Sequence, residues 1–121
     1  MIESSPEVTM SLRDKAATRI VNDFNRYLDE ISRVLVRARK FVPAVMQRTI
    51  TAEAYESLFD ALSAAFMYVE ICNGMIQRMK QMEFDEDSIT ALIQRGMVMY
   101  SELVAIDRAA ESVAKELGYA E

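Results

Sequence analysis

Apolar residues recur every three or four positions along almost the whole of this chain, and few residues interrupt the pattern. The 121 residues include only three glycines and two prolines. A spacing of three and four puts apolar side chains on one face of an α-helix. The sequence therefore predicts an all-α protein, in which short connectors join three long helices into an antiparallel up-down-up bundle. Homodimerisation is a further expectation, as a way to complete this bundle.

The first helix is expected from about Ser11 to Phe41, with an alternative earlier start at Ser5-Pro6-Glu7. Serine suits an N-cap, and proline suits the first turn because its missing N–H is not needed there. Pro43 should end this helix, since the residue before a proline avoids helical geometry. The expected organisation is a partly disordered leader at residues 1–10 and a single helical domain at residues 11–121, with a connector at residues 43–50 that has room for a short helical turn.

The second helix, Thr51 to Met82, is rich in apolar residues on both flanks as well as on its inner face. Such a helix needs two neighbours, as the middle member of an antiparallel bundle has. Asn73-Gly74 lies within it and is also a turn signal, so a continuous or kinked helix and a break into two helices both remain open. The apolar positions keep their phase across this pair, which favours the continuous helix.

The predicted starts of the second and third helices share one signature: an apolar residue, then a capping residue, then an apolar residue in the first turn. In order, these residues are Ile50, Thr51 and Tyr55 at the second helix, and Phe84, Asp85 and Ile89 at the third. The third helix should run from Glu86 to Leu117, with Gly118 as its C-terminal cap. Gly96 has no turn partner, so it predicts a close approach of another backbone.

Residues that most catalytic and metal sites need are missing from the sequence. It contains no histidine and one cysteine, Cys72, which lies on the apolar face of the second helix. Without histidine, the chain lacks the commonest general base and metal ligand. The thiol of Cys72 is expected to be buried and therefore unreactive. The acidic run from Glu83 to Asp87 lacks the ligand spacing of a calcium loop and suits a helix start. We expect no enzymatic activity, no metal and no cofactor, because carboxylates such as Asp60 and Glu70 do not share a cleft.

Composition also limits the partners and the compartment. A formal net charge of -5 disfavours binding to nucleic acid or to an anionic membrane. No apolar run approaches the roughly 18 uninterrupted residues of a membrane helix, and no signal-peptide pattern is visible. A single cysteine allows no internal disulfide, which fits a reducing compartment. The sequence therefore predicts a cytoplasmic protein that binds neither nucleic acid nor membrane.

A basic row follows the outer face of the first helix. Arg19, Arg26, Arg33 and Lys40 recur every seven residues, and Arg37 joins them. One interpretation is a solvated face, partly neutralised by an ion pair between Asp29 and Arg33. The other is a docking strip for an acidic segment of a partner protein, formed by Arg26, Arg33, Arg37 and Lys40.

Nine methionines occur in the chain, and several apolar residues lie away from the inner faces of the helices. These outlying residues are Met67 and Ile71 in the second helix, and Met97, Val98 and Val104 in the third. Flexible methionine side chains suit adaptable binding of a helix in a groove. The five residues are therefore predicted to bind a helix or amphipathic segment of a protein partner, with a second copy of this chain as an equal candidate.

Small acidic all-helical proteins of this size resemble secretion and flagellar export chaperones. The segment Leu58-Phe59-Asp60-Ala61 resembles part of one flagellin-chaperone family, over these four residues only. The leading hypothesis is a non-enzymatic helical adaptor or chaperone-like protein that binds a partner helix. The alternative is a bundle that binds a small apolar ligand, with Tyr27, Tyr68 or Tyr100 as polar handles.

Overall fold

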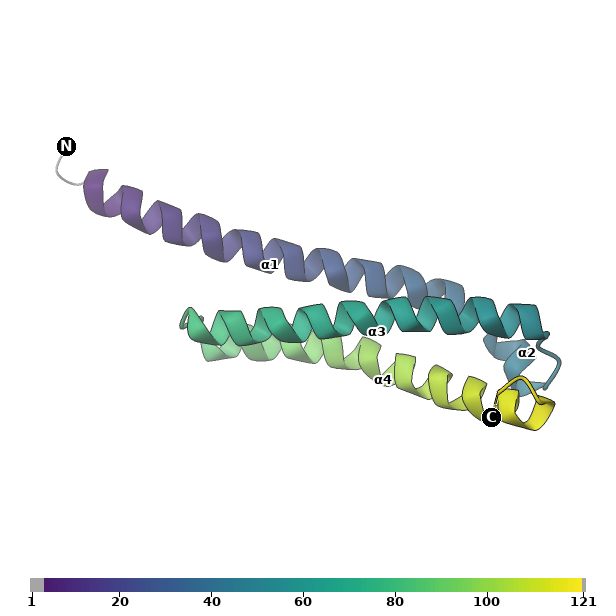
Figure 1. Ribbon diagram of the computed structural model, residues 1–121. Coiled ribbons are helices and arrows are strands. Elements are labelled where there is room, and N and C mark those ends of the chain that lie inside the picture. Colours follow the sequence, from purple (N-terminus) through teal and green to yellow (C-terminus); the bar gives the residue numbers. More distant parts are fainter. Residues whose placement is uncertain (1–3, 121) are drawn as a thin grey trace.

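A computed structural model describes the backbone of residues 4–120 and the side chains of residues 12–120. It contains four helices: α1 (Ser4–Arg39), α2 (Val42–Met46), α3 (Ala52–Gln81) and α4 (Glu86–Leu117). No strand occurs between residues 4 and 120, so the all-α prediction is confirmed. The three long helices pack together over part of their length, the N-terminal part of α1 diverges from α3 and α4, and the short α2 lies at one end of the molecule (Figure 1).

The first helix begins earlier than its main predicted start. α1 starts at Ser4, close to the alternative start, because Pro6 falls in the first turn, where a helix does not need its N–H. Of the expected leader at residues 1–10, positions 1–3 lie outside the described residues and the others belong to α1. Pro43 lies in the first turn of α2, so the expected connector does contain a short helix.

Local sequence signals set the starts of α3 and α4 as predicted. The Thr51 hydroxyl accepts a hydrogen bond from the backbone N–H of Ala54 at 3.1 Å, and the Asp85 carboxylate accepts one from the backbone N–H of Ser88 at 3.2 Å. α3 continues through Asn73-Gly74, so the alternative of two separate helices is wrong. Gly118 ends α4 in the left-handed conformation, with a φ of 80°.

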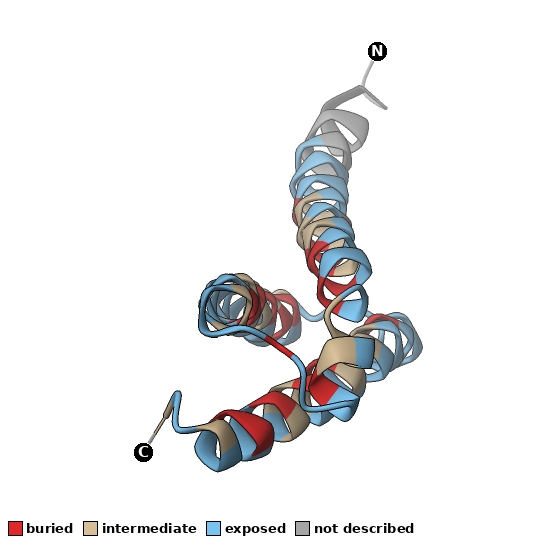
Figure 2. Cartoon of the chain, turned by 90° about the vertical axis from the view of Figure 1, so that its right-hand side faces the viewer, coloured by how far each residue is buried: buried red, intermediate tan, exposed pale blue. Residues whose placement is uncertain are grey.

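The core lies between the facing sides of α1, α3 and α4, which carry the buried residues in the roughly end-on view of Figure 2. Its largest fully buried side chains are Phe24, Leu28, Ile31, Leu35, Leu58, Met79 and Leu103. Within the described part of the chain, no polar or charged side chain is buried. Apolar packing therefore holds the long helices together.

Polar contacts across the helices lie at the surface, and several of them reach α4. The Arg95 guanidinium donates to the Asn25 side-chain oxygen at 2.9 Å, and that of Arg39 donates to the Glu102 carboxylate at 2.7 Å. The hydrogen bond from Arg39 lowers the pKa of Glu102. Since Asn25 and Arg39 belong to α1, these contacts identify the flank of α4 that faces α1.

Candidate functional site

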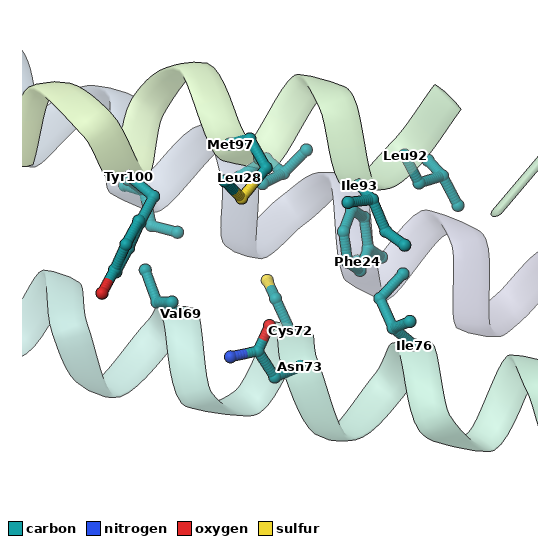
Figure 3. Close-up of a pocket in the computed structure, with 12 residues that line it drawn as sticks. Phe24, Leu28, Val69, Cys72, Asn73, Ile76, Leu92, Ile93, Met97 and Tyr100 are labelled. Carbon is teal, nitrogen blue, oxygen red and sulfur yellow. The ribbon is translucent and has the colours of Figure 1, made fainter. Parts of the chain in front are cut away.

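An open apolar groove of about 310 Å³ runs between α3 and α4, with α1 at its base (Figure 3). The base is formed by Phe24, Leu28 and Ile31, the α3 wall by Val69, Cys72, Asn73 and Ile76, and the α4 wall by Leu92, Ile93, Gly96, Met97 and Tyr100. The amide of Asn73 and the hydroxyl of Tyr100 are polar groups among mainly apolar neighbours. A concave site of this composition can receive apolar side chains of a helix or a small apolar molecule.

Gly96 belongs to the α4 wall and keeps part of the groove open. A Cβ placed on Gly96 would lie 3.8 Å from Leu28 Cδ2, and no backbone atom of another helix lies within 4 Å of it. This distance is an ordinary van der Waals contact, so the predicted close approach of another backbone is wrong. The absent side chain instead leaves space for an occupant.

We expect the substitution Gly96→Ala to stabilise the protein by about 0.5–1 kcal/mol, because alanine favours the helical backbone and its methyl group fits beside Leu28. Gly74→Ala is the matched control, since Gly74 lies inside α3 and a Cβ there meets nothing within 4 Å. Urea denaturation should show a similar gain for both variants, whereas only Gly96→Ala narrows the groove. Destabilisation by Gly96→Ala alone would show that the groove walls cannot accept the methyl group.

Cys72 lies in the α3 wall, with its sulfur directed into the groove (Figure 3). Burial removes the thiol from water and raises its pKa to about 11. The thiol is therefore neutral near pH 7 and contributes an apolar surface to the wall. The prediction that Cys72 is buried on the inner face of its helix is confirmed.

The predicted partner-binding residues of α4 lie on two different flanks of the helix. Met97 lines the groove, and Val104, which is half-buried, lies two turns further on the same flank. Val98 is 75% exposed, but it lies three residues after Arg95 and four before Glu102, which contact α1. Residues three and four apart share a side of a helix, so Val98 is separate from the groove.

The two predicted partner-binding residues of α3 are exposed but do not line the groove. Met67 and Ile71 are both at the surface, whereas the groove receives Val69, Cys72 and Asn73 from this part of α3. Residues two apart point to different sides of a helix, which places Ile71 away from Asn73. The five residues thus do not form one continuous site, and their role in binding stays a prediction.

Two exposed residues of the α4 wall are missing from the predicted partner-binding set. Ile93 and Tyr100 line the groove, four residues before and three residues after Met97. This spacing puts all three side chains on one flank, and it is the sequence signal that could have identified the groove. Of the tyrosines expected as polar handles, Tyr100 lines the groove, whereas the rings of Tyr27 and Tyr68 pack together with centroids 5.7 Å apart.

Part of the basic row on α1 is neutralised within the same helix. Arg26 pairs with Asp23 at 3.2 Å, and Arg33 pairs with Glu30 at 2.7 Å, not with Asp29 as predicted. These pairs join residues three apart, which are neighbours on a helix. Arg37 and Lys40 are exposed nearby. Docking of an acidic segment on these residues stays a prediction, and the observed pairs support the solvated face.

α4 has an unusual amount of exposed apolar surface. It is long enough and apolar enough to cross a membrane, and only 17% of its most apolar 18-residue stretch is buried in the chain. This character rests on length and composition only, and the charged residues Arg95 and Glu102 interrupt its apolar sequence, so it contains no uninterrupted apolar run of about 18 residues. Arg95 and Glu102 nevertheless make polar contacts with α1, which hold this helix against the rest of the protein.

Among the described side chains, no group of three or more histidine, cysteine, aspartate or glutamate residues is placed to hold a metal ion. No family model, no curated protein sequence and no solved structure matches this chain. The groove between α3 and α4 is therefore the main candidate for a functional site.

Proposed function

We propose that this protein is a non-enzymatic helical adaptor, of a chaperone-like kind, that holds a helix of a partner protein in the groove between α3 and α4. The observation that carries this proposal is the open apolar groove, whose walls and base come from all three long helices. In this proposal the long helices form an antiparallel up-down-up bundle, and the partner provides the fourth helix. Helix-in-groove binding uses apolar anchors at helical spacing, and the α4 wall offers Ile93, Met97 and Tyr100 at such a spacing.

The amount of exposed surface supports an interaction. The chain has 8342 Å² of accessible surface and a mass of 13.8 kDa. A compact monomer of this mass exposes about 6,600 Å². The elongated shape accounts for part of the excess, and α4 contributes exposed apolar residues on the groove side and beyond it. A typical stable interface buries roughly 1,200–2,000 Å² in total, which this surface can supply.

Photo-cross-linking from two neighbouring positions tests this proposal. A photoreactive amino acid placed at Met97 should yield a discrete adduct with a partner helix, because this side chain is 53% exposed on the groove rim. The same amino acid placed at Val98 is the matched control, since Val98 is also exposed but lies on the other flank of α4. Identical adducts from both positions, or none from Met97, would contradict the groove as the binding site.

Adducts between two copies of the chain would show homodimerisation, which the proposal includes as a second way to complete the bundle. Binding to nucleic acid and to membranes is not part of the proposed function, because the chain carries a net charge of -5. A single buried cysteine supports a location in the cytoplasm, where thiols stay reduced.

A second candidate function is the binding of a small apolar ligand. The groove volume of about 310 Å³ lies at the lower end of the range for ligand sites. The Tyr100 hydroxyl and the Asn73 amide could orient such a ligand. A panel of small aromatic compounds should then raise the melting temperature of the protein, and Gly96→Leu should remove this effect by filling the groove. Compounds that stabilise both proteins equally would exclude the groove as a ligand site.

A further inference from the structure

Acidic side chains border the apolar part of the groove on the α4 side. One flank of α4 carries Ile93, Met97 and Tyr100 in its middle, Glu86 at one end, and Asp107 and Glu111 at the other. These positions follow one another at steps of three, four or seven residues, so they form one stripe along the helix. The stripe from Glu86 to Glu111 is about 38 Å long at the rise of an α-helix.

The α3 wall adds a further acidic residue. Glu70 is exposed and lies three residues before Asn73, which lines the groove, and four residues after Phe66. The ring of Phe66 packs edge-on against Tyr100 of α4, with centroids 6.2 Å apart. Glu70 therefore shares the side of α3 that faces α4, and it borders the opening of the groove.

Among the described side chains, most of these carboxylates form no salt bridge. Among residues 12–120, Glu111 pairs with Lys115 at 3.3 Å, whereas Glu70, Glu86 and Asp107 form no salt bridge. Asp107 is half-buried; desolvation and the nearby charge of Glu111 raise its pKa, and the nearby charge of Arg108 partly opposes them. A cation of the partner beside Asp107 would add to the stabilisation of the carboxylate that Arg108 already provides.

The charge pattern disfavours a second copy of the chain as the occupant. If two copies packed groove against groove, the acidic ends of the two stripes would face each other whether the helices ran parallel or antiparallel. Like charges brought together at an interface oppose association. The basic row of α1 cannot fill the groove of another copy either, because its outer face carries charged residues and lacks apolar anchors at helical spacing.

We propose that the groove binds an amphipathic helix with a basic rim: apolar side chains along one face, and lysine or arginine residues on both sides of that face and near both ends. This inference rests on the proposed function and specifies the chemistry of the partner. The apolar face enters between Val69, Ile93 and Met97, while the cations approach Glu70, Asp107 and Glu86. Apolar contact supplies most of the affinity, and the charges supply selectivity and faster association.

Two synthetic helices of about 20 residues test this inference, because about 30 Å of helix spans the stripe from Glu86 to Asp107. Both peptides carry the same leucine and phenylalanine face, flanked by lysine in one and by glutamate in the other. Their binding to the full chain is followed by fluorescence anisotropy at low and at high salt. The lysine peptide should bind at least about tenfold more tightly at low salt, and the difference should shrink as salt screens the charges.

Substitutions on the protein show which carboxylates produce the preference for the lysine peptide. Glu70→Gln and Asp107→Asn should each lower the affinity for the lysine peptide by about two- to fivefold. Neither substitution should lower the affinity for the glutamate peptide. Asp60→Asn is the matched control, since Asp60 is exposed and lies three turns from Ile71 on the side of α3 away from the groove. Met97→Ala should lower the affinity for both peptides, while Val98→Ala should change neither affinity.

The outcomes separate this inference from the proposed function. If the two peptides bind with equal affinity and Met97→Ala lowers both affinities, the preference for a basic rim is overturned and the groove remains a helix-binding site. If neither peptide binds, or if Met97→Ala leaves both affinities unchanged, the inference and the proposed function are both contradicted. Light scattering gives the mass of the protein in solution. If the unmodified protein is a dimer and Met97→Asp makes it a monomer, a second copy occupies the groove and the inference is overturned.

Discussion

Replacement of Phe24 by alanine is expected to lower the free energy of unfolding by about 3–5 kcal/mol. The Phe24 side chain is 2% exposed and lies where the core meets the base of the groove. Its removal takes away apolar contacts with α3 and α4 and leaves a cavity that the surrounding helices can fill only in part. Because small domains are stable by about 5–15 kcal/mol, this loss should be visible as a large shift of the urea midpoint, measured by circular dichroism.

Phe59→Ala is the matched control for this substitution. Phe59 is 52% exposed on α3, and its described aromatic contact is with the ring of Tyr55, at a centroid distance of 6.3 Å. We expect a loss below about 1.5 kcal/mol, because the exposed ring gives up little buried area. Equal losses in the two variants would mean that Phe59 is covered in solution, as in a dimer that packs on this side of α3.

The second large effect concerns the reactivity of Cys72. With a pKa of about 11, the thiol of the folded protein should react with an aromatic disulfide reagent at pH 8 about a hundredfold more slowly than the thiol of the urea-unfolded chain. The rate in the folded protein should rise about tenfold for each pH unit between pH 8 and pH 10, because only the thiolate reacts. Absorbance of the released reagent measures both rates, and Cys72→Ala provides the background.

The same group links stability to pH. Burial raises the pKa of Cys72 above its ordinary value of 9.0, so folding favours the protonated thiol. Its contribution to stability is therefore complete below about pH 9 and is lost as the pH rises through about 11. Comparison with Cys72→Ala at pH 7 and pH 11 isolates this contribution from other groups that titrate there. Rapid labelling of the folded protein at pH 8 would instead show that water reaches the sulfur through the groove.

Features fixed by nearby residues could be predicted from the sequence. The caps at Thr51 and Asp85 depend on a side chain and a backbone N–H three residues later, so a short window of sequence contains both partners. The continuity of α3 through Gly74 follows from an apolar pattern with unbroken phase. The start of α1 was harder to place, because two segments of this region carry a serine cap signal and only one of them can begin the helix.

The groove could not be predicted, because it depends on how far apart α3 and α4 lie. A glycine at position 96 is compatible both with the close approach of another backbone and with an empty space beside the helix, and the sequence does not distinguish them. Met97 and Val98 are both apolar residues away from the inner face, and only the contacts of Arg95 and Glu102 with α1 assign them to different flanks. A position away from the inner face therefore groups residues that the fold separates, and the missing information is the position of the neighbouring helices.

The wholly apolar core has a consequence for how the groove can respond to an occupant. Among the side chains of residues 12–120 no buried polar group fixes the register of α3 against α4. Buried hydrogen-bond networks often lock one arrangement of helices, so the position of α3 against α4 depends on the fit of apolar side chains. Methionine side chains such as Met79 can repack when this fit changes. We therefore expect a site that accepts related helices with anchors of different size.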